Sequence, residues 1–202
     1  FIETFGCQMN VHDSERLSGL LRTAGFESTE LIDEADLVLI NTCSVRERAQ
    51  EKLFARLERF NGRKRESRPM IAVTGCVAQQ EGANILKRSP LVDVVVGTQA
   101  LTKLPELVLR AEQESVSQIN IEPYDSVSFP LGIAVRKDPV KAYVSIIEGC
   151  NDFCSFCVVP YTRGNERMRP ALEIIDEISE AAASGHSEIH LLGQIVNHYQ
   201  AP

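Results

Sequence analysis

Six cysteines, arranged as two sets of three, are the residues of this 202-residue sequence best suited to chemistry. The first set is spread out, each member directly after a short apolar run, and the second forms a compact Cys-x3-Cys-x2-Cys loop: Cys7, Cys43 and Cys76, then Cys150, Cys154 and Cys157. A structural zinc site takes four ligands, and a disulfide joins two cysteines. A cubane iron–sulfur cluster held by three cysteines leaves one iron open for another ligand. We therefore predict two iron–sulfur sites.

Other interpretations of the cysteines stay open at this point. The first three could be buried core residues, because free cysteine packs like a small hydrophobe. A zinc site in the loop would need a fourth ligand, and the downstream histidines, His186 and His190, lie far from it in sequence. A secreted disulfide framework is disfavoured, since such frameworks belong mainly to short chains with thin cores and 44% of this chain is hydrophobic. Cysteine usage thus favours a reduced, cytoplasmic, metal-binding protein.

The bulk composition excludes some classes of partner. No apolar stretch approaches the roughly 18 residues that a membrane-spanning helix needs, and no signal peptide is visible, so we expect no membrane association. The formal net charge of −7 gives no global electrostatic footprint for nucleic acid. One basic run, residues 63–68, fits either a solvated loop or an RNA-facing patch.

Residues 1–112, which contain the first three cysteines, alternate between strand-like and helix-like segments. Apolar runs predict strands over 1–5, 37–40, 70–74 and 92–96, and helical periodicity predicts helices over 13–23, 47–60, 79–87 and 102–111. Asp13 or Ser14 is expected to cap the first helix and Gly25 to end it. This alternation indicates an α/β fold with a parallel sheet and right-handed crossovers.

The first three cysteines each follow a predicted strand of that sheet. Ligands of open parallel sheets gather beyond the carboxyl ends of the strands. Cys7, Cys43 and Cys76 are therefore expected to meet at one edge, with Gly6 and Gly75 allowing a sharp turn and close backbone approach.

A change of pattern after residue 115 predicts three regions. We expect an N-terminal domain over 1–115, a linker over 116–138 with a short strand at 118–121, and a second βα series over 139–202. That series begins with a strand at 142–147, continues through the cysteine loop 149–157 and a helix at 171–183, and ends with a strand at 188–192. Because two strands cannot close a barrel, we expect the chain to be part of a longer protein. Phe153 and Phe156 are expected to shield the loop from water.

The Cys-x3-Cys-x2-Cys loop directly after a strand resembles that of radical S-adenosylmethionine (SAM) enzymes. Further segments are similar to the methylthiotransferases of that superfamily, most of all the MiaB-like tRNA branch: 6–10, 13–15, 41–47, 75–80, 158–164 and 191–194. The resemblance covers nearly the whole chain. It implies that the second series is the start of a radical SAM partial barrel, and that further barrel strands and a C-terminal RNA-binding module lie outside this sequence.

The resemblance also implies a set of roles. Cys7, Cys43 and Cys76 would bind an auxiliary 4Fe-4S cluster that carries the sulfur to be transferred. The loop cysteines would bind a second, radical-generating 4Fe-4S cluster, with S-adenosyl-L-methionine contacted by Arg163, Gly193 and Gln194. Arg169 is another candidate contact with S-adenosyl-L-methionine or substrate, and for both arginines the alternative is a surface salt bridge.

The implied reaction is methylthiolation of C2 of N6-isopentenyladenosine at position 37 of tRNA. It would use an external flavodoxin- or ferredoxin-type electron donor, in an enzyme expected to be a monomer. The alternatives are a methylthiotransferase acting on threonylcarbamoyladenosine tRNA or on ribosomal protein S12, and, outside enzymes, an iron–sulfur regulatory protein. Ile195, Asn165 and Met168 depart from the family's usual residues but leave the cysteines untouched.

Overall fold

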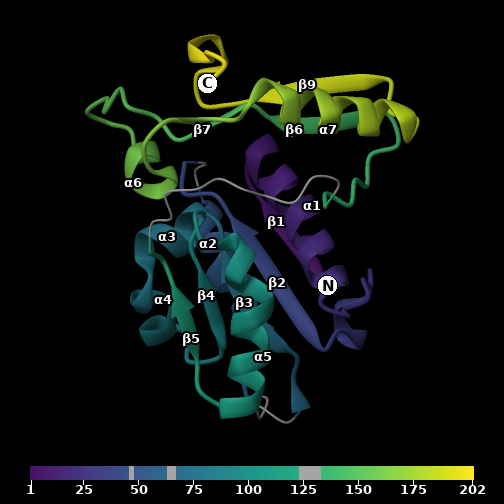
Figure 1. Ribbon diagram of the computed structural model, residues 1–202. Coiled ribbons are helices and arrows are strands. Elements are labelled where there is room, and N and C mark those ends of the chain that lie inside the picture. Colours follow the sequence, from purple (N-terminus) through teal and green to yellow (C-terminus); the bar gives the residue numbers. More distant parts are fainter. Residues whose placement is uncertain (46–47, 63–66, 123–132) are drawn as a thin grey trace.

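The computed structural model describes residues 1–45, 48–62, 67–122 and 133–202 (Figure 1). Most of the basic run at 63–68 lies outside these residues. A parallel sheet flanked by helices forms the larger part of the molecule, and a smaller β/α part lies across the end of helix α1 (Gln8–Thr23).

Five strands form the sheet, and all of them run parallel. Their order follows the chain: β1 (Ile2–Phe5), β2 (Leu37–Thr42), β3 (Met70–Thr74), β4 (Val94–Val96) and β5 (Gln118–Asn120). The predicted α/β fold with a parallel sheet is confirmed. The short strand predicted at 118–121, within the range predicted as a linker, is observed as β5. It pairs with β4 at the edge of the sheet.

Alternating residues of the central strands face two separate cores, which is why helices cover both faces of the sheet. Leu37 and Leu39 pack with α1 and α5 (Leu104–Glu114), which follows a 3-10 turn at Leu101–Lys103. Val38 and Ile40 pack on the other face with α2 (Ala49–Glu58) and α4 (Ala83–Arg88). Strands that are buried on both faces are typical of α/β sheets.

Two predicted helices differ from those in the structure. The first, α1, begins at Gln8 instead of residue 13, so its N-cap is Cys7, and the predicted caps Asp13 and Ser14 lie buried within the helix. The helix predicted over 79–87 is two helices, α3 (Cys76–Glu81) and α4, because Gly82 between them has φ 50° and ψ −124°, outside the helical region.

The smaller part holds a two-stranded parallel sheet of β6 (Lys141–Ser145) and β9 (Glu188–Leu192), covered by α7 (Ala171–Ala183). The strand predicted over 142–147 is divided, since β7 (Ile147–Glu148) leaves β6 to pair antiparallel with β8 (Arg167–Met168). Between them runs α6 (Val159–Arg163). Short 3-10 turns lie at Ile32–Glu34 and Val196–His198.

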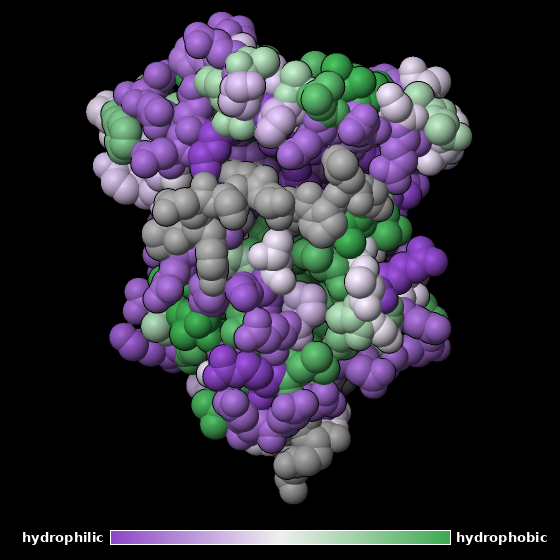
Figure 2. Space-filling view, viewed as in Figure 1, coloured by the Kyte–Doolittle hydropathy of each residue, from purple (hydrophilic) through white to green (hydrophobic). Residues whose placement is uncertain are grey.

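The outer surface of α7 carries exposed apolar side chains. Leu172 and Ile175 are 74% and 55% exposed, and Figure 2 shows a small hydrophobic group among mainly hydrophilic residues at this end of the molecule. Among the described residues, no helix combines the length and apolar character required to cross a membrane.

Candidate functional site

The first three cysteines stand at the carboxyl ends of β1, β2 and β3, as predicted. Phe5 pairs with Thr42, and the Cys43 amide donates to the Phe5 carbonyl at 2.8 Å, which brings the strand ends into register. Cys7 then caps α1, and Cys76 opens α3. The topology thus gathers three thiols from well-separated positions at one edge of the sheet.

Two asparagines, buried completely, tie this edge together. The Asn10 side-chain amide donates to the Asn41 Oδ1 at 2.9 Å, and Asn41 Nδ2 donates back to the Asn10 carbonyl at 2.8 Å. The Cys7 thiol donates to Asn10 Oδ1 at 3.3 Å. Because each asparagine has several partners, the amide pair fixes the start of α1 against the end of β2.

Two of the three thiols of this edge, those of Cys7 and Cys76, favour their anionic form. Hydrogen bonding with the Cys43 side chain is the largest influence on both neighbours: it lowers the pKa of Cys7 to about 5 and that of Cys76 to about 6, although burial opposes both shifts. The positive charge of Arg163 lowers both pKa values further. Since the thiolate is the form that binds metal, this donor set fits an iron–sulfur cluster.

Arg163 lies beside the first cysteine set rather than at the cysteine loop of its own segment. Its guanidinium donates to Asp13 Oδ2 at 2.6 Å, and both side chains are 5% exposed or less. Its positive charge also acts on the Cys76 thiol, whose pKa it lowers. Although burial opposes it, the negative charges of Asp13 and Cys76 raise the pKa of Arg163 well above its usual value, so it stays charged. Its contact with S-adenosyl-L-methionine stays a prediction.

The second set, Cys150, Cys154 and Cys157, lies on a tight loop after β7. Cys150 is buried and its amide donates to the Gly164 carbonyl at 3.1 Å, while the Cys157 amide donates to the Cys154 carbonyl at 2.9 Å. Cys154 is exposed and Cys157 is partly buried. Gly149 has φ 82°, and a Cβ there would lie 2.0 Å from the Asn165 carbonyl oxygen, so this turn requires glycine.

The aromatic residues of the loop face solvent. Phe156 is 92% exposed and Phe153 is 55% exposed, so the prediction that they shield the cysteines is wrong. Phe153 instead stacks edge to face with Tyr161, with ring centroids 6.3 Å apart.

Gly193 and Gln194 follow β9 at the carboxyl edge of the smaller sheet, where its parallel neighbour β6 leads into β7 and the cysteine loop. Gly193 packs so closely on Ile147 that a Cβ would lie 2.1 Å from the Ile147 Cγ2 atom. The Oε1 atom of Gln194 is buried and accepts no hydrogen bond from the described residues. A buried amide oxygen without a donor fits a site that a polar ligand completes.

Charged contacts join the two parts of the molecule along α1. The Arg16 guanidinium donates to the buried Glu148 carboxylate at 2.8 Å, two residues before Cys150. Within the smaller part, Arg169 pairs with Glu177 at 2.6 Å; this ion pair is buried, whereas the alternative for this residue was a surface salt bridge. The sequence analysis missed the roles of Asp13, Arg16 and Glu148. The available signal was the run of charged residues at 12–16, within a helix that packs against the sheet.

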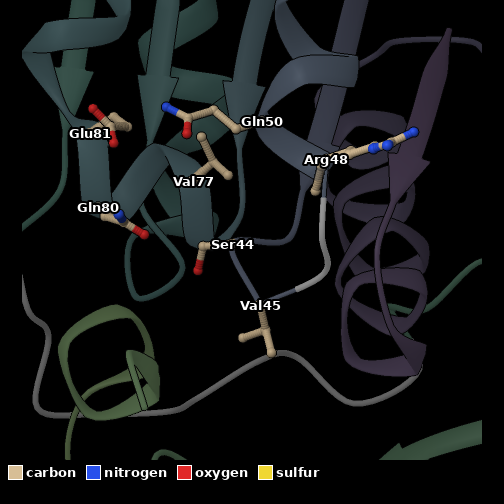
Figure 3. Close-up of a pocket in the computed structure, with 8 residues that line it drawn as sticks. Ser44, Val45, Arg48, Gln50, Val77, Gln80 and Glu81 are labelled. Carbon is tan, nitrogen blue, oxygen red and sulfur yellow. The ribbon is translucent and has the colours of Figure 1, made fainter. Parts of the chain in front are cut away.

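A small polar pocket of about 210 Å³ flanks the first cysteine set, and its position was not predicted. Figure 3 shows its lining residues, which come from the segment after Cys43 and from α2 and α3: Ser44, Val45, Arg48, Ala49, Gln50, Val77, Gln80 and Glu81. Within the described ranges, no three acidic, histidine or cysteine side chains converge on a single metal ion. A cubane cluster differs from such a site, because each thiolate binds a separate iron.

Comparisons with known proteins identify relatives of the chain. Residues 1–97 match the family described as "Uncharacterized protein family UPF0004". The chain is 49% identical over 99% of its length to a tRNA-2-methylthio-N(6)-dimethylallyladenosine synthase of Neisseria gonorrhoeae (strain NCCP11945), covering 46% of that protein. Synthases of the same name from Bordetella avium and Stenotrophomonas maltophilia are 49% and 46% identical over 99% and 100% of the chain, which covers 42% and 43% of them.

A solved structure shares the fold. The radical S-adenosylmethionine methyltransferase TsrM from Kitasatospora setae, with cobalamin and a [4Fe-4S] cluster bound, has a TM-score of 0.61 and 14% sequence identity. The match covers 98% of this chain and 48% of TsrM. Of the curated synthases named above, too, the chain spans less than half the length.

Proposed function

Because this chain is related over its whole length to the tRNA-2-methylthio-N(6)-dimethylallyladenosine synthases, we propose that it carries the two cluster sites of a radical SAM tRNA methylthiotransferase. The observation that carries the proposal is the meeting of Cys7, Cys43 and Cys76 at one sheet edge, with lowered thiol pKa values, in a chain that also holds the Cys-x3-Cys-x2-Cys loop. The proposed substrate is N6-isopentenyladenosine at position 37 of tRNA, modified at C2.

In this proposal each cysteine set holds one 4Fe-4S cluster, and Gly193 and Gln194 bind S-adenosyl-L-methionine. When bound, these cofactors supply a radical that removes hydrogen from an unactivated carbon, and sulfur for its replacement. The chain's own residues prepare the sites. Hydrogen bonding with Cys43 keeps its neighbours deprotonated, and the Gly193–Ile147 contact brings the end of β9 close to the cysteine loop. The buried Gln194 Oε1 offers an acceptor to the cofactor.

An external flavodoxin- or ferredoxin-type protein is the proposed electron donor, because cysteine loops of this type hold clusters that must be reduced before each reaction. Cys154 is the exposed member of this cysteine set, and we propose that the donor approaches from its side. We further propose that the enzyme is cytoplasmic, in keeping with six unpaired cysteines, and that it acts as a monomer.

The test is anaerobic reconstitution of the full-length protein with iron and sulfide, followed by iron counting and Mössbauer spectroscopy. We expect about eight irons in the parent and about four in each of two triple variants, Cys7/Cys43/Cys76→Ala and Cys150/Cys154/Cys157→Ala. Each variant is the control for the other. Bound zinc, or loss of all iron from both variants, would contradict two independent clusters.

Activity assays separate the candidate functions. The parent is incubated with S-adenosyl-L-methionine, a reductant, and either isopentenyladenosine tRNA, threonylcarbamoyladenosine tRNA or ribosomal protein S12, and products are identified by mass spectrometry. Methylthiolation of the first substrate alone supports the proposal. Clusters without reductive cleavage of S-adenosyl-L-methionine would favour an iron–sulfur regulatory protein.

A further inference from the structure

The segment that follows the second cysteine loop is fixed onto the larger part of the molecule. Thr98 Oγ1 donates to the Thr162 carbonyl, and a Cβ on Gly164 would lie 2.7 Å from the Gln99 Nε2 atom. Arg167 donates to Gln99 Oε1 at 3.4 Å. These contacts hold α6 against the loop after β4, close to α3, which begins at Cys76.

Arg163 stands at the centre of this junction. It comes six residues after Cys157 in the chain, yet its guanidinium pairs with Asp13 of α1, and its helix α6 packs against α3, which begins at Cys76. Removing two charges from water is costly, and the planar fork of arginine cannot be replaced by lysine at such a site. Removing one partner of such a pair leaves an uncompensated buried charge, so the paired arrangement is strongly preferred.

The same helix also holds the other end of the cysteine loop. Arg16 of α1 pairs with Glu148, just before Cys150, and Asp13 of α1 pairs with Arg163, just after the loop. Cys7 is the N-cap of this helix, so Asp13 and Arg16 follow it by about 9 and 14 Å along the helix axis. A single rigid helix therefore sets the distance from the first cysteine set to both ends of the second.

We propose that Arg163 is a positioning residue of the first cysteine set: fixed by Asp13, it docks the segment of the second set onto α1 and places a permanent positive charge beside Cys76. This inference rests on the proposed function, because it concerns a cluster on Cys7, Cys43 and Cys76. The reduction potential of such a cluster depends on nearby charge and on hydrogen bonds to its sulfur ligands. A guanidinium there stabilises the reduced, more negative state.

The first experiment measures the potential of the auxiliary cluster. In full-length protein carrying Cys150/Cys154/Cys157→Ala, the remaining cluster is titrated by EPR with and without Arg163→Gln. We expect R163Q to lower its reduction potential. The control is Arg59→Gln. Arg59 is the C-cap of α2 and forms an exposed ion pair with Asp33, so this variant removes the same charge and should leave the reduction potential unchanged. An unchanged potential in R163Q, or an equal shift in R59Q, would overturn the role of the charge.

The second experiment measures position, and it covers the case in which R163Q fails to bind iron. In the protein with both clusters bound, Arg163→Lys keeps the positive charge but removes the planar guanidinium group. We therefore expect pulsed EPR to show a broader distribution of distances between the two reduced clusters. The matched control is Arg68→Lys, at a buried pair with Asp93 (2.7 Å, side chains 5% and 2% exposed) within the larger part. Equal distributions in both lysine variants would refute the positioning role. Failure of the parent to bind two clusters would instead refute the proposed function.

Discussion

Replacement of Gly75 by alanine tests whether the first cysteine set depends on close approach of the backbone. Gly75 separates β3 from Cys76 and has φ 92° and ψ −166°, a region that is essentially restricted to glycine. A Cβ there would lie 2.4 Å from Asn41 Oδ1 and 2.5 Å from the Thr42 carbonyl oxygen, and these buried atoms have little freedom to move.

The expected destabilisation has two sources. The strained backbone costs about 1–3 kcal/mol, and the overlap with Asn41 and Thr42 costs about another 1–3 kcal/mol. Gly25 provides the matched control, because its φ is 93° but a Cβ there would meet nothing within 4 Å. Gly25→Ala should therefore lose only the backbone contribution, about 1–2 kcal/mol.

The assay is urea unfolding of the full-length apoprotein, followed by circular dichroism, with iron counting on the reconstituted variants. We expect G75A to be less stable than G25A by about 1 kcal/mol or more and, because Cys76 must shift, to lose the auxiliary cluster while keeping the radical cluster. If G75A and G25A unfold at the same urea concentration and bind the same iron, close packing at this edge is not what positions Cys76.

Three further changes test other parts of the molecule. Gln194→Leu should weaken binding of S-adenosyl-L-methionine in calorimetry without changing the iron content, because it removes the buried acceptor; unchanged affinity would place the cofactor elsewhere. Leu53→Ala, on the buried face of α2, should cost about 2–5 kcal/mol in urea unfolding. Burial raises the pKa of Glu15 from 4.5 to about 7, so folding favours its protonated form and stability should fall as pH rises between these values. Glu15→Gln should flatten that slope in unfolding measured from pH 4 to 8, and an unaltered slope would assign it to other groups.

The sheet and the first cysteine set were predictable because their signals are local. Apolar runs before Cys7, Cys43 and Cys76 mark buried strands, and parallel topology then brings the strand ends together. The start of α1 was not predictable in this way. Amphipathic patterns assume one apolar core and one solvent-exposed face. Asn10, by contrast, is polar and buried against the end of β2, and Asp13 is polar and buried against Arg163 of the smaller part.

The pairing of Asp13 with Arg163 had even less local signal, since 150 residues separate the two. An ion pair between distant positions leaves no periodicity, and each residue alone has a common interpretation, as a helix cap or as a cofactor contact. The division between α3 and α4 was more accessible, because Gly82 within a short helical pattern is a known breaker.

A polar junction suits a protein that must hold two reactive sites at a fixed separation. Apolar surfaces are non-directional and can pack in several registers, whereas an ion pair such as Arg16–Glu148 is strong only in one geometry. The buried charges contribute little net stability, since their desolvation offsets most of their attraction. Removing one partner, however, leaves an unpaired buried charge, so the intact arrangement is strongly preferred over any shifted one. The placement of the cysteine loop against the sheet edge therefore depends on a few charged side chains of α1 more than on the area that the two parts bury.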